Sequence, residues 1–337
     1  MITTIPTGDV PAERSAPLAH THVDYLDGWR GLAILLVLQN HFLPIQGFDT
    51  GELGVDIFFG LSGLLMSNLL FVKRTPLRTF YKRRVSRILP AFFLFVLVAY
   101  GTAAWLGHAR SGLEIISTLT FLRTYIPAVP DIWSTGLPIG HLWSLNVEEH
   151  SYVFLSLIAL SAAARGRETW ILVIVSVLMM GLYHIYQMSP SMASTSFEIR
   201  TEIAATFLLL SAGYFLVCNR FAHLVRWWMP LAAIPIAALG YSDRFDWWVG
   251  AIVSPIALAF SVNHLQQTPK LFLELLSSTG MRYMGLWSFS IYLWQQPFAT
   301  YKTALPPGVA PAGALLAGLI SYYIVEKPSR AWINAHW

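Results

Sequence analysis

The chain has 337 residues, of which 55% are hydrophobic and only 12% are charged, against roughly 25% charged in an ordinary soluble domain. This deficit excludes a soluble globular protein, because a soluble fold of this size needs a charged surface that the composition does not supply. The formal net charge of +4 would suggest nucleic-acid binding in a soluble protein, but here it follows from membrane topology, and no nucleic-acid partner is expected.

Ten apolar stretches follow one another along the chain. Most of them are close in length to the roughly 20 residues that a helix needs to cross the hydrocarbon core of a membrane. They predict an all-α, polytopic integral membrane protein with about ten transmembrane helices. The stretches are 26–46, 53–72, 86–108, 142–164, 169–188, 201–218, 226–240, 247–264, 281–301 and 311–326. One transmembrane domain, 26–330, is expected between a short disordered cytoplasmic tail, 1–25, and a cytoplasmic C-terminal tail, 331–337.

Basic residues are distributed unevenly between the connecting segments. With the N-terminus in the cytoplasm, the inner segments carry 17 of the 22 Lys and Arg residues and the outer segments carry 5. This asymmetry is what the positive-inside rule describes. It predicts that both termini are cytoplasmic and that the protein is a multi-pass protein of the inner (plasma) membrane, with the lipid bilayer as its immediate partner.

The first apolar stretch carries three ionisable residues on one helical stripe. Arg30 and His41 lie three turns apart, about 16 Å along the axis, and Asp27 lies one turn below Arg30, at a spacing that suits an ion pair. Ionisable groups within a membrane are rare and usually functional. Simpler interpretations exist for each residue alone: Arg30 as a snorkelling anchor, Asp27 as a helix cap and His41 as an interfacial hydrogen-bonding group.

Residues 26–33, followed by His41, resemble the opening signature of the acyltransferase-3 family, whose hallmark is a basic residue and a histidine separated by ten residues. In this chain they are Arg30 and His41. Five further segments resemble later landmarks of the family in the same order, namely 54–63, 80–90, 141–150, 290–297 and 323–328. Gln295 stands where the family commonly has a histidine, so no role is carried over to it.

The resemblance implies a membrane-bound O-acyltransferase with acyl-CoA, commonly acetyl-CoA, as co-substrate and with no bound cofactor. A donor that carries phosphates needs cations on the cytoplasmic side, and arginine donates two parallel hydrogen bonds to phosphate. Arg84 and Arg87 share one helical face, and Arg30 lies at the same level, so these three are expected to form a phosphate cradle. The alternative is that residues 82–87 are a charge cluster that only sets topology.

His41 is then the candidate general base, since the ordinary pKa of histidine lies near working pH. Asp27 is too far along the same helix to orient its ring, so two partners remain open, Asp56 and Glu148. Glu148 shares a face with Ser144 and Tyr152 and is preferred as a site residue. The predicted catalytic residues are His41, Arg30 and Glu148, the predicted substrate- and acyl-CoA-binding residues are Arg84, Arg87, Asp27, Asp56 and Ser144, and no metal site is expected.

The acceptor is expected to be a hydroxyl of a cell-surface or secreted glycan or of its lipid-linked precursor, with a small glycosylated metabolite as the alternative. A transporter is the competing class, in which the same charges would line a substrate path. The charged motifs crowd into residues 26–150, whereas transporters often repeat them in two halves, so an enzyme is favoured. Ser62, which lies between small residues, is expected to serve helix packing.

Overall fold

The computed structural model describes residues 23–128, 131–193 and 195–337, and these residues form helices and loops with no β-strand. The helices are α1 (Asp24–Phe42), α2 (Thr50–Ser67), α3 (Leu77–Trp105), α4 (Gly112–Leu119), α5 (Leu142–Leu160), α6 (Glu168–Met188), α7 (Pro190–Ala193), α8 (Thr201–Ala204), α9 (Thr206–Phe215), α10 (Cys218–Phe221), α11 (Met229–Ala238), α12 (Ser254–Asn263), α13 (Lys270–Leu276), α14 (Thr279–Thr300), α15 (Val309–Ser321) and α16 (Lys327–His336). The all-α prediction is therefore confirmed for the described residues.

Of the two predicted tails, the structure describes the C-terminal one in full and the N-terminal one only in part. Most of the predicted disordered segment 1–25 lies outside the described residues, and α1 already begins at Asp24. The predicted C-terminal tail 331–337 belongs to α16 almost to its end. Pro328 at the start of α16 suits this position, because proline is well tolerated in the first turn of a helix.

Each of the ten predicted stretches contains a helix, but fewer of these helices meet the length and hydropathy expected of a span. Among the described residues, four helices do so, and a fifth is added if the bent pair 201–215 and 218–224 counts as one crossing. Helices α1, α5 and α14 have 19, 19 and 22 residues, enough for a crossing, but they carry many polar side chains. The four helices of sufficient length and hydropathy indicate a membrane protein.

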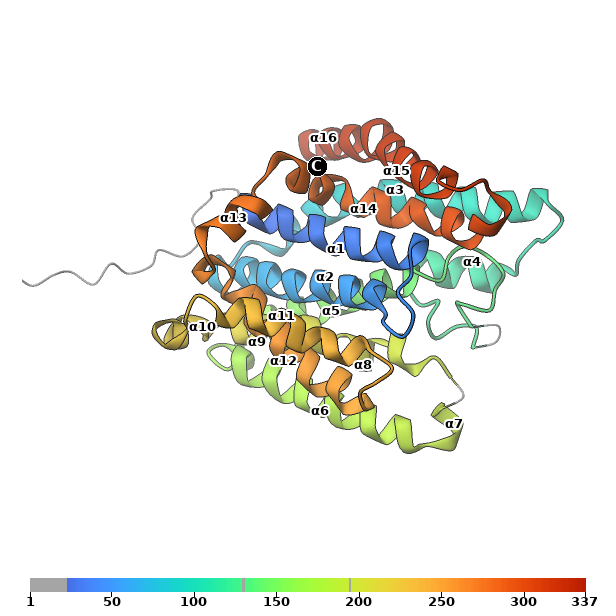
Figure 1. Ribbon diagram of the computed structural model, residues 1–337. Helices are drawn as coiled ribbons and strands as arrows, with labels where there is room; N and C mark the ends of the chain where they lie inside the picture. The colour runs from blue at the N-terminus through green and yellow to red at the C-terminus, as the bar shows by residue number, and fades with distance from the viewer. Residues whose placement is uncertain (1–22, 129–130, 194) are drawn as a thin grey trace, which may run out of the picture.

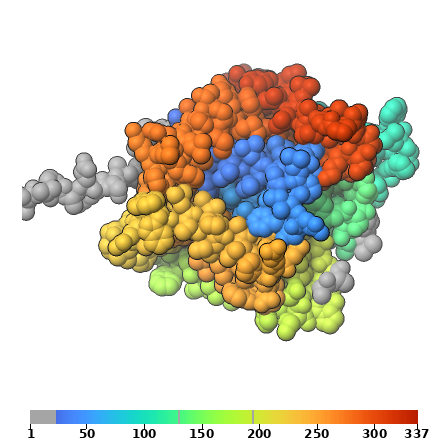
Figure 2. Space-filling model, viewed as in Figure 1, coloured from blue at the N-terminus to red at the C-terminus, as the bar shows by residue number. Residues whose placement is uncertain are grey.

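The elements that matter for the site surround α1 (Figure 1). Helix α1 packs between α2 and α14, α15 covers the outer side of α14, and α16 packs against α3. On the opposite side, α2 packs against α9 and α12, and α6 lies beyond α9. In the space-filling view, the surface of α1 and α2 is flanked by the C-terminal helices on one side and by the α11–α12 region on the other (Figure 2).

Glycines allow α1 and α14 to approach closely. A Cβ atom on Gly285 of α14 would overlap the carbonyl oxygen of Asp27, and one on Gly31 of α1 would overlap the carbonyl oxygen of Met281. Small residues at helix contacts are a common means of packing within membranes, because they bring backbones together. This contact fixes the height of Arg30 and His41 relative to the side chains of α14.

We expect Gly285→Ala to lower the thermal stability of the purified protein, because the added methyl group meets backbone atoms that cannot move aside; overpacking of this kind costs about 1–3 kcal/mol. Gly280→Ala is the matched control, since a Cβ at Gly280 meets no atom within 4 Å and alanine favours the helix by about 1 kcal/mol. Thermal unfolding in detergent measures both. Equal melting temperatures for the two variants would contradict the close packing of α1 on α14.

Candidate active site

A cavity of about 940 Å³ opens at the end of the bundle where α1, α3 and α14 begin. Its walls come from α1, α2, α3, α5 and α14, with residues of the last helical segment at its mouth. Six of the eight predicted site residues line it, two from each of α1, α3 and α5: Asp27, Arg30, Arg84, Arg87, Ser144 and Glu148. His41 and Asp56 are not among the lining residues.

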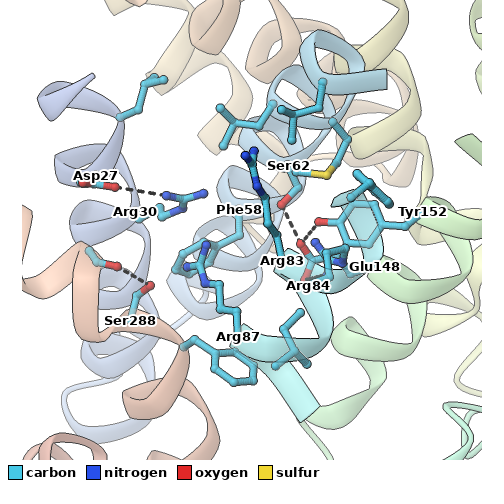
Figure 3. Close-up of a pocket in the computed structure, with 18 of the residues that line it drawn as sticks. Asp27, Arg30, Phe58, Ser62, Arg83, Arg84, Arg87, Glu148, Tyr152 and Ser288 are labelled. Carbon is cyan, nitrogen blue, oxygen red and sulfur yellow. Dashed lines mark hydrogen bonds and ion pairs between the residues drawn. The ribbon is translucent and has the colours of Figure 1, made fainter. Parts of the chain in front are cut away.

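The lining of this cavity is strongly cationic. Seven basic side chains contribute to it against three carboxylates. The basic residues are Arg30, Lys73, Lys82, Arg83, Arg84, Arg87 and Arg330, and the acidic residues are Asp27, Glu148 and Glu326. Figure 3 shows Arg30, Arg83, Arg84 and Arg87 among the side chains that line the cavity. A cavity with this excess of positive charge is suited to an anion.

The ion pair predicted within α1 is present. Arg30 Nη1 lies 3.1 Å from Asp27 Oδ1, one helical turn away, as the spacing indicated. The two side chains are 20% and 17% exposed, so the pair is largely shielded and faces the cavity (Figure 3). Arg30 is therefore held by a carboxylate and still presents its remaining N–H groups to the cavity.

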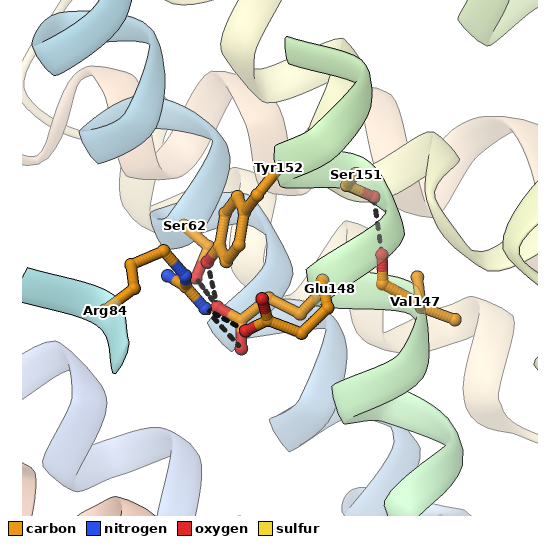
Figure 4. A network of polar contacts seen from close by, with 7 residues as sticks. Ser62, Arg84, Val147, Glu148, Ser151 and Tyr152 are labelled. Atoms are coloured by element: carbon orange, nitrogen blue, oxygen red, sulfur yellow. Dashed lines mark hydrogen bonds and ion pairs between the residues drawn. The ribbon is translucent and has the colours of Figure 1, made fainter. Parts of the chain in front are cut away.

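Arg84, which was predicted to bind the donor phosphates, is instead bound by two carboxylates of the protein (Figure 4). Its Nη2 atom lies 2.7 Å from Glu149 Oε1 and 3.9 Å from Glu148 Oε2. Its guanidinium carbon lies 3.4 Å from the centroid of the Tyr152 ring, a cation–π contact that adds to the attraction. The position of Arg84 in the cavity wall agrees with the prediction, but its charge is already compensated within the protein.

Glu148 is the centre of a hydrogen-bonded group that joins α2 to α5. Its Oε1 atom accepts a hydrogen bond of 2.7 Å from Ser62 Oγ and another from the Tyr152 hydroxyl (Figure 4). The predicted common face of Ser144, Glu148 and Tyr152 is confirmed, since all three line the cavity. The packing interpretation of Ser62 was incomplete, because its hydroxyl reaches a carboxylate 86 positions further along the chain.

Four other cations of the cavity form no ion pair with a described residue. Lys73, Arg83 and Arg330 are exposed near its mouth and Arg87 is partly buried deeper inside; none of the four forms an ion pair with a described residue. Glu326 interacts electrostatically with Arg87 and Arg330, but its carboxylate accepts its hydrogen bond from Ser290, at 2.7 Å. These four side chains are therefore available for an anionic ligand.

His41 has a partner that the sequence did not indicate. Its Nδ1 atom lies 2.5 Å from Oε1 of Gln295 on α14, and Gln295 is fully buried. Neither partner considered from the sequence contacts His41: Glu148 belongs to the Ser62 and Tyr152 group, and Asp56 accepts a hydrogen bond of 2.7 Å from the Tyr241 hydroxyl. His41 contacts Gln295 because α1 packs closely against α14, which places the two side chains beside each other.

The cavity ends below His41 at a pair of hydroxyl groups. Ser144 Oγ and the Tyr292 hydroxyl lie 2.7 Å apart, and they also reach the carbonyl oxygen of His141, at 3.1 Å and 2.9 Å. Tyr292 and Gln295 are three residues apart on α14 and so share a face, about one turn from each other. His41 therefore lies about one helical turn beyond the closed end of the cavity.

Comparisons with known proteins show what the chain is similar to. The profile of a family described as an acyltransferase domain matches residues 23–326. A Bacillus subtilis protein, provisionally named the peptidoglycan O-acetyltransferase YrhL, is 26% identical over 92% of this chain and 55% of its own length. The O-acetyltransferase OatA of Staphylococcus aureus strain NCTC 8325 is 26% identical over 90% of this chain and 57% of its own length.

A further Staphylococcus aureus protein, from strain COL and provisionally named an O-acetyltransferase, is 26% identical over 81% of this chain and 50% of its own length. The chain thus spans about half the length of the curated relatives that it matches. No solved structure matches the chain significantly.

Proposed function

Because this chain belongs to the acyltransferase-3 family of membrane proteins, we propose that it is an O-acetyltransferase that moves an acetyl group from acetyl-CoA to a hydroxyl of a glycan. The observation that carries the proposal is the cationic cavity, which leads from one end of the bundle to within one turn of His41. Its volume of about 940 Å³ is near the upper limit of ordinary ligand pockets, about 300–1,000 Å³, and suits a long donor.

The donor enters with its phosphates at the mouth of the cavity. There the side chains of Lys73, Arg83 and Arg330, which form no ion pair with a described residue, bind the nucleotide phosphates, and Arg87 binds them from deeper inside. Arginine is well suited because its planar fork donates two hydrogen bonds to one phosphate. The uncharged pantetheine arm then extends toward Ser144 and Tyr292, so that the thioester lies at the closed end of the cavity.

This placement supports the topology proposed from the sequence. Acyl-CoA is a cytoplasmic molecule, and the cations of the mouth belong to segments that the positive-inside rule places in the cytoplasm. We therefore propose that the mouth faces the cytoplasm, with both termini on that side, and that the shorter and more polar helices complete about ten crossings of the plasma membrane. Asp27 and Arg30 of α1 and Glu148 of α5 face the cavity instead of lipid, as intramembrane ionisable groups do.

His41 acts as the general base, and Gln295 orients its ring. Because Gln295 Oε1 accepts the hydrogen bond, Nδ1 carries the proton and Nε2 is left with its lone pair for the acceptor hydroxyl. The amide of Gln295 is held in this orientation by a hydrogen bond from its Nε2 to Gln296 Oε1, at 3.3 Å. A neutral partner fixes the tautomer without adding the negative charge that a carboxylate would supply.

The acceptor is proposed to be a cell-wall glycan such as peptidoglycan, in keeping with the name of the Bacillus subtilis relative. The test is to reconstitute the purified protein in nanodiscs with acetyl-CoA labelled in the acetyl group, and to add soluble peptidoglycan fragments. We expect label in the glycan that mild alkali releases as acetate, which is the signature of an O-acetyl ester. If label appeared only in a small glycosylated metabolite, that metabolite and not peptidoglycan would be the acceptor. Solute uptake by proteoliposomes without any acetyl transfer would refute the proposal that the protein is an enzyme.

A further inference from the structure

His141 lies between the closed end of the cavity and His41. It stands at the start of α5, is 2% exposed, and packs edge-on against Phe95 and Tyr292, with ring centroids 5.3 Å apart in both pairs. Tyr292 lines the cavity, and the rings of His141 and His41 are close enough to interact electrostatically. His141 is therefore a second imidazole beside the position where the thioester and the acceptor hydroxyl would meet.

The ring nitrogens of His141 have no satisfactory protein partner. A backbone group of Leu293 lies near the ring, but neither nitrogen makes a hydrogen bond with a described residue. A buried polar group without a partner costs about 1–3 kcal/mol, and native proteins keep few of them. If His141 only filled space among aromatic rings, phenylalanine would do so without this cost. Its unsatisfied nitrogens therefore point to a ligand.

A second unsatisfied donor lies in the same layer. Nε1 of Trp294 is buried and makes no hydrogen bond with a described residue, and the Trp294 ring packs edge-on against the same Phe95, with centroids 5.5 Å apart. Trp294 directly precedes Gln295, the partner of His41. Two unsatisfied N–H donors around one phenylalanine, next to the proposed base, form a region suited to a developing negative charge.

We propose that His141 is a further catalytic residue, which donates a hydrogen bond from a ring N–H to the carbonyl oxygen of the donor thioester. This inference rests on the proposed acetyl transfer. The acceptor hydroxyl oxygen bonds to the carbonyl carbon while His41 takes its proton, and the carbonyl electron pair moves onto the oxygen that His141 stabilises. When that pair returns, the carbon–sulfur bond breaks and the thiolate takes the proton from His41.

His141 keeps its own proton throughout this sequence, so it acts as a neutral donor. Its surroundings favour the neutral form, because the rings of Phe95 and Tyr292 exclude water and a buried imidazolium without a counter-ion is costly. The carboxylate of Glu148 is engaged with Ser62 and Tyr152. A neutral imidazole that polarises a carbonyl group is an established catalytic device.

The first test compares His141→Phe, His141→Ala and His141→Gln, where only the glutamine keeps an N–H donor. We expect the phenylalanine and alanine variants to lose about 10²–10³-fold in kcat, the usual effect of removing one oxyanion donor, with little change in the Kd for acetyl-CoA. His141→Gln should recover at least tenfold relative to alanine. Wild-type kcat in His141→Phe would show that the residue only packs, and equal loss in all three variants would refute a donor role.

The matched control is His264→Phe. His264 is also 2% exposed, but its Nε2 lies 2.7 Å from the Tyr214 hydroxyl, and it does not line the cavity. This variant should lose stability without the same loss of kcat. If His264→Phe lowers kcat as much as His141→Phe does, removal of a buried histidine alone explains the effect and the proposal fails.

A second measurement needs no acceptor and separates this inference from the proposed function. Infrared spectra of acetyl-CoA carrying carbon-13 in the acetyl carbonyl report hydrogen bonding to that oxygen. We expect a shift to lower frequency on binding to the wild type and to His41→Ala, and no shift on binding to His141→Phe. Equal frequencies with wild type and His141→Phe would refute the role of His141 even if acetyl transfer is confirmed; failure of acetyl-CoA to bind the wild type would refute both.

Discussion

Replacement of His41 by alanine is expected to lower the rate of acetyl transfer about 10²–10⁴-fold, the usual contribution of a general base. Donor binding should remain close to that of the wild type, because the proposed phosphate site lies at the mouth of the cavity, the end away from His41. The measurement is a single-turnover assay at saturating acetyl-CoA, with acetyl-CoA affinity measured separately by calorimetry.

The control for this variant is His108→Ala, since His108 is exposed in the loop after α3 and lies outside the cavity lining. It should transfer acetyl at the wild-type rate. A His41→Ala protein that folds normally and transfers acetyl as fast as the wild type would disprove the assignment of the base. The same loss of activity accompanied by loss of acetyl-CoA binding would instead place His41 in donor recognition.

Arg84→Ala and Arg87→Ala are expected to have different effects, although the two residues are only three positions apart: the first should lower stability and the second should weaken acetyl-CoA binding. Arg84→Ala leaves Glu149 and Glu148 without their cation, and breaking such a pair costs about 3 kcal/mol or more; the side chains are only 13–24% exposed. We expect a marked fall in thermal stability. Arg87→Ala removes a side chain that forms no ion pair with a described residue, so stability should hardly change, while the Kd for acetyl-CoA rises about 10–100-fold.

A double-mutant cycle tests the first half of this prediction. Glu149→Gln removes the nearest carboxylate, so adding it to Arg84→Ala should restore part of the lost stability. Thermal unfolding of the four proteins gives the coupling. If instead Arg84→Ala keeps its melting temperature and weakens acetyl-CoA binding as strongly as Arg87→Ala does, then Arg84 is a phosphate ligand, as the sequence alone suggested.

The helices were predictable because a membrane imposes long apolar stretches, and local contacts within one helix were predictable because helical spacing is regular. The Asp27–Arg30 pair and the shared face of Ser144 and Glu148 follow from spacings of three and four residues. The number of crossings is a harder inference, since α11 and α12 are short and α1 and α5 carry polar groups. Hydropathy alone does not distinguish a short crossing from a buried helix.

Contacts between helices were not predictable from one sequence, because they depend on how the helices pack. Gln295 lies 254 positions from His41, and no local pattern links the two. The glycines Gly31 and Gly285 gave the available signal, since small residues mark close helix contacts in membranes. In the sequence, Ser62 and His141 stand out only as members of motifs. The structure shows their contacts: Ser62 donates a hydrogen bond to Glu148, and His141 packs against Tyr292.

The hydrogen-bonded hydroxyls of Ser144 and Tyr292 have a consequence for the membrane itself. A cationic vestibule that ran straight through the protein would conduct anions and discharge the membrane potential, and each elementary charge that crosses 100 mV dissipates about 2.3 kcal/mol. The vestibule stops at these hydroxyls and the aromatic rings beyond them, so the field falls across this thin layer. In the proposed reaction the acetyl group, which is uncharged, passes the layer without electrical work, whereas the coenzyme with its phosphates would be retained on the side from which it came.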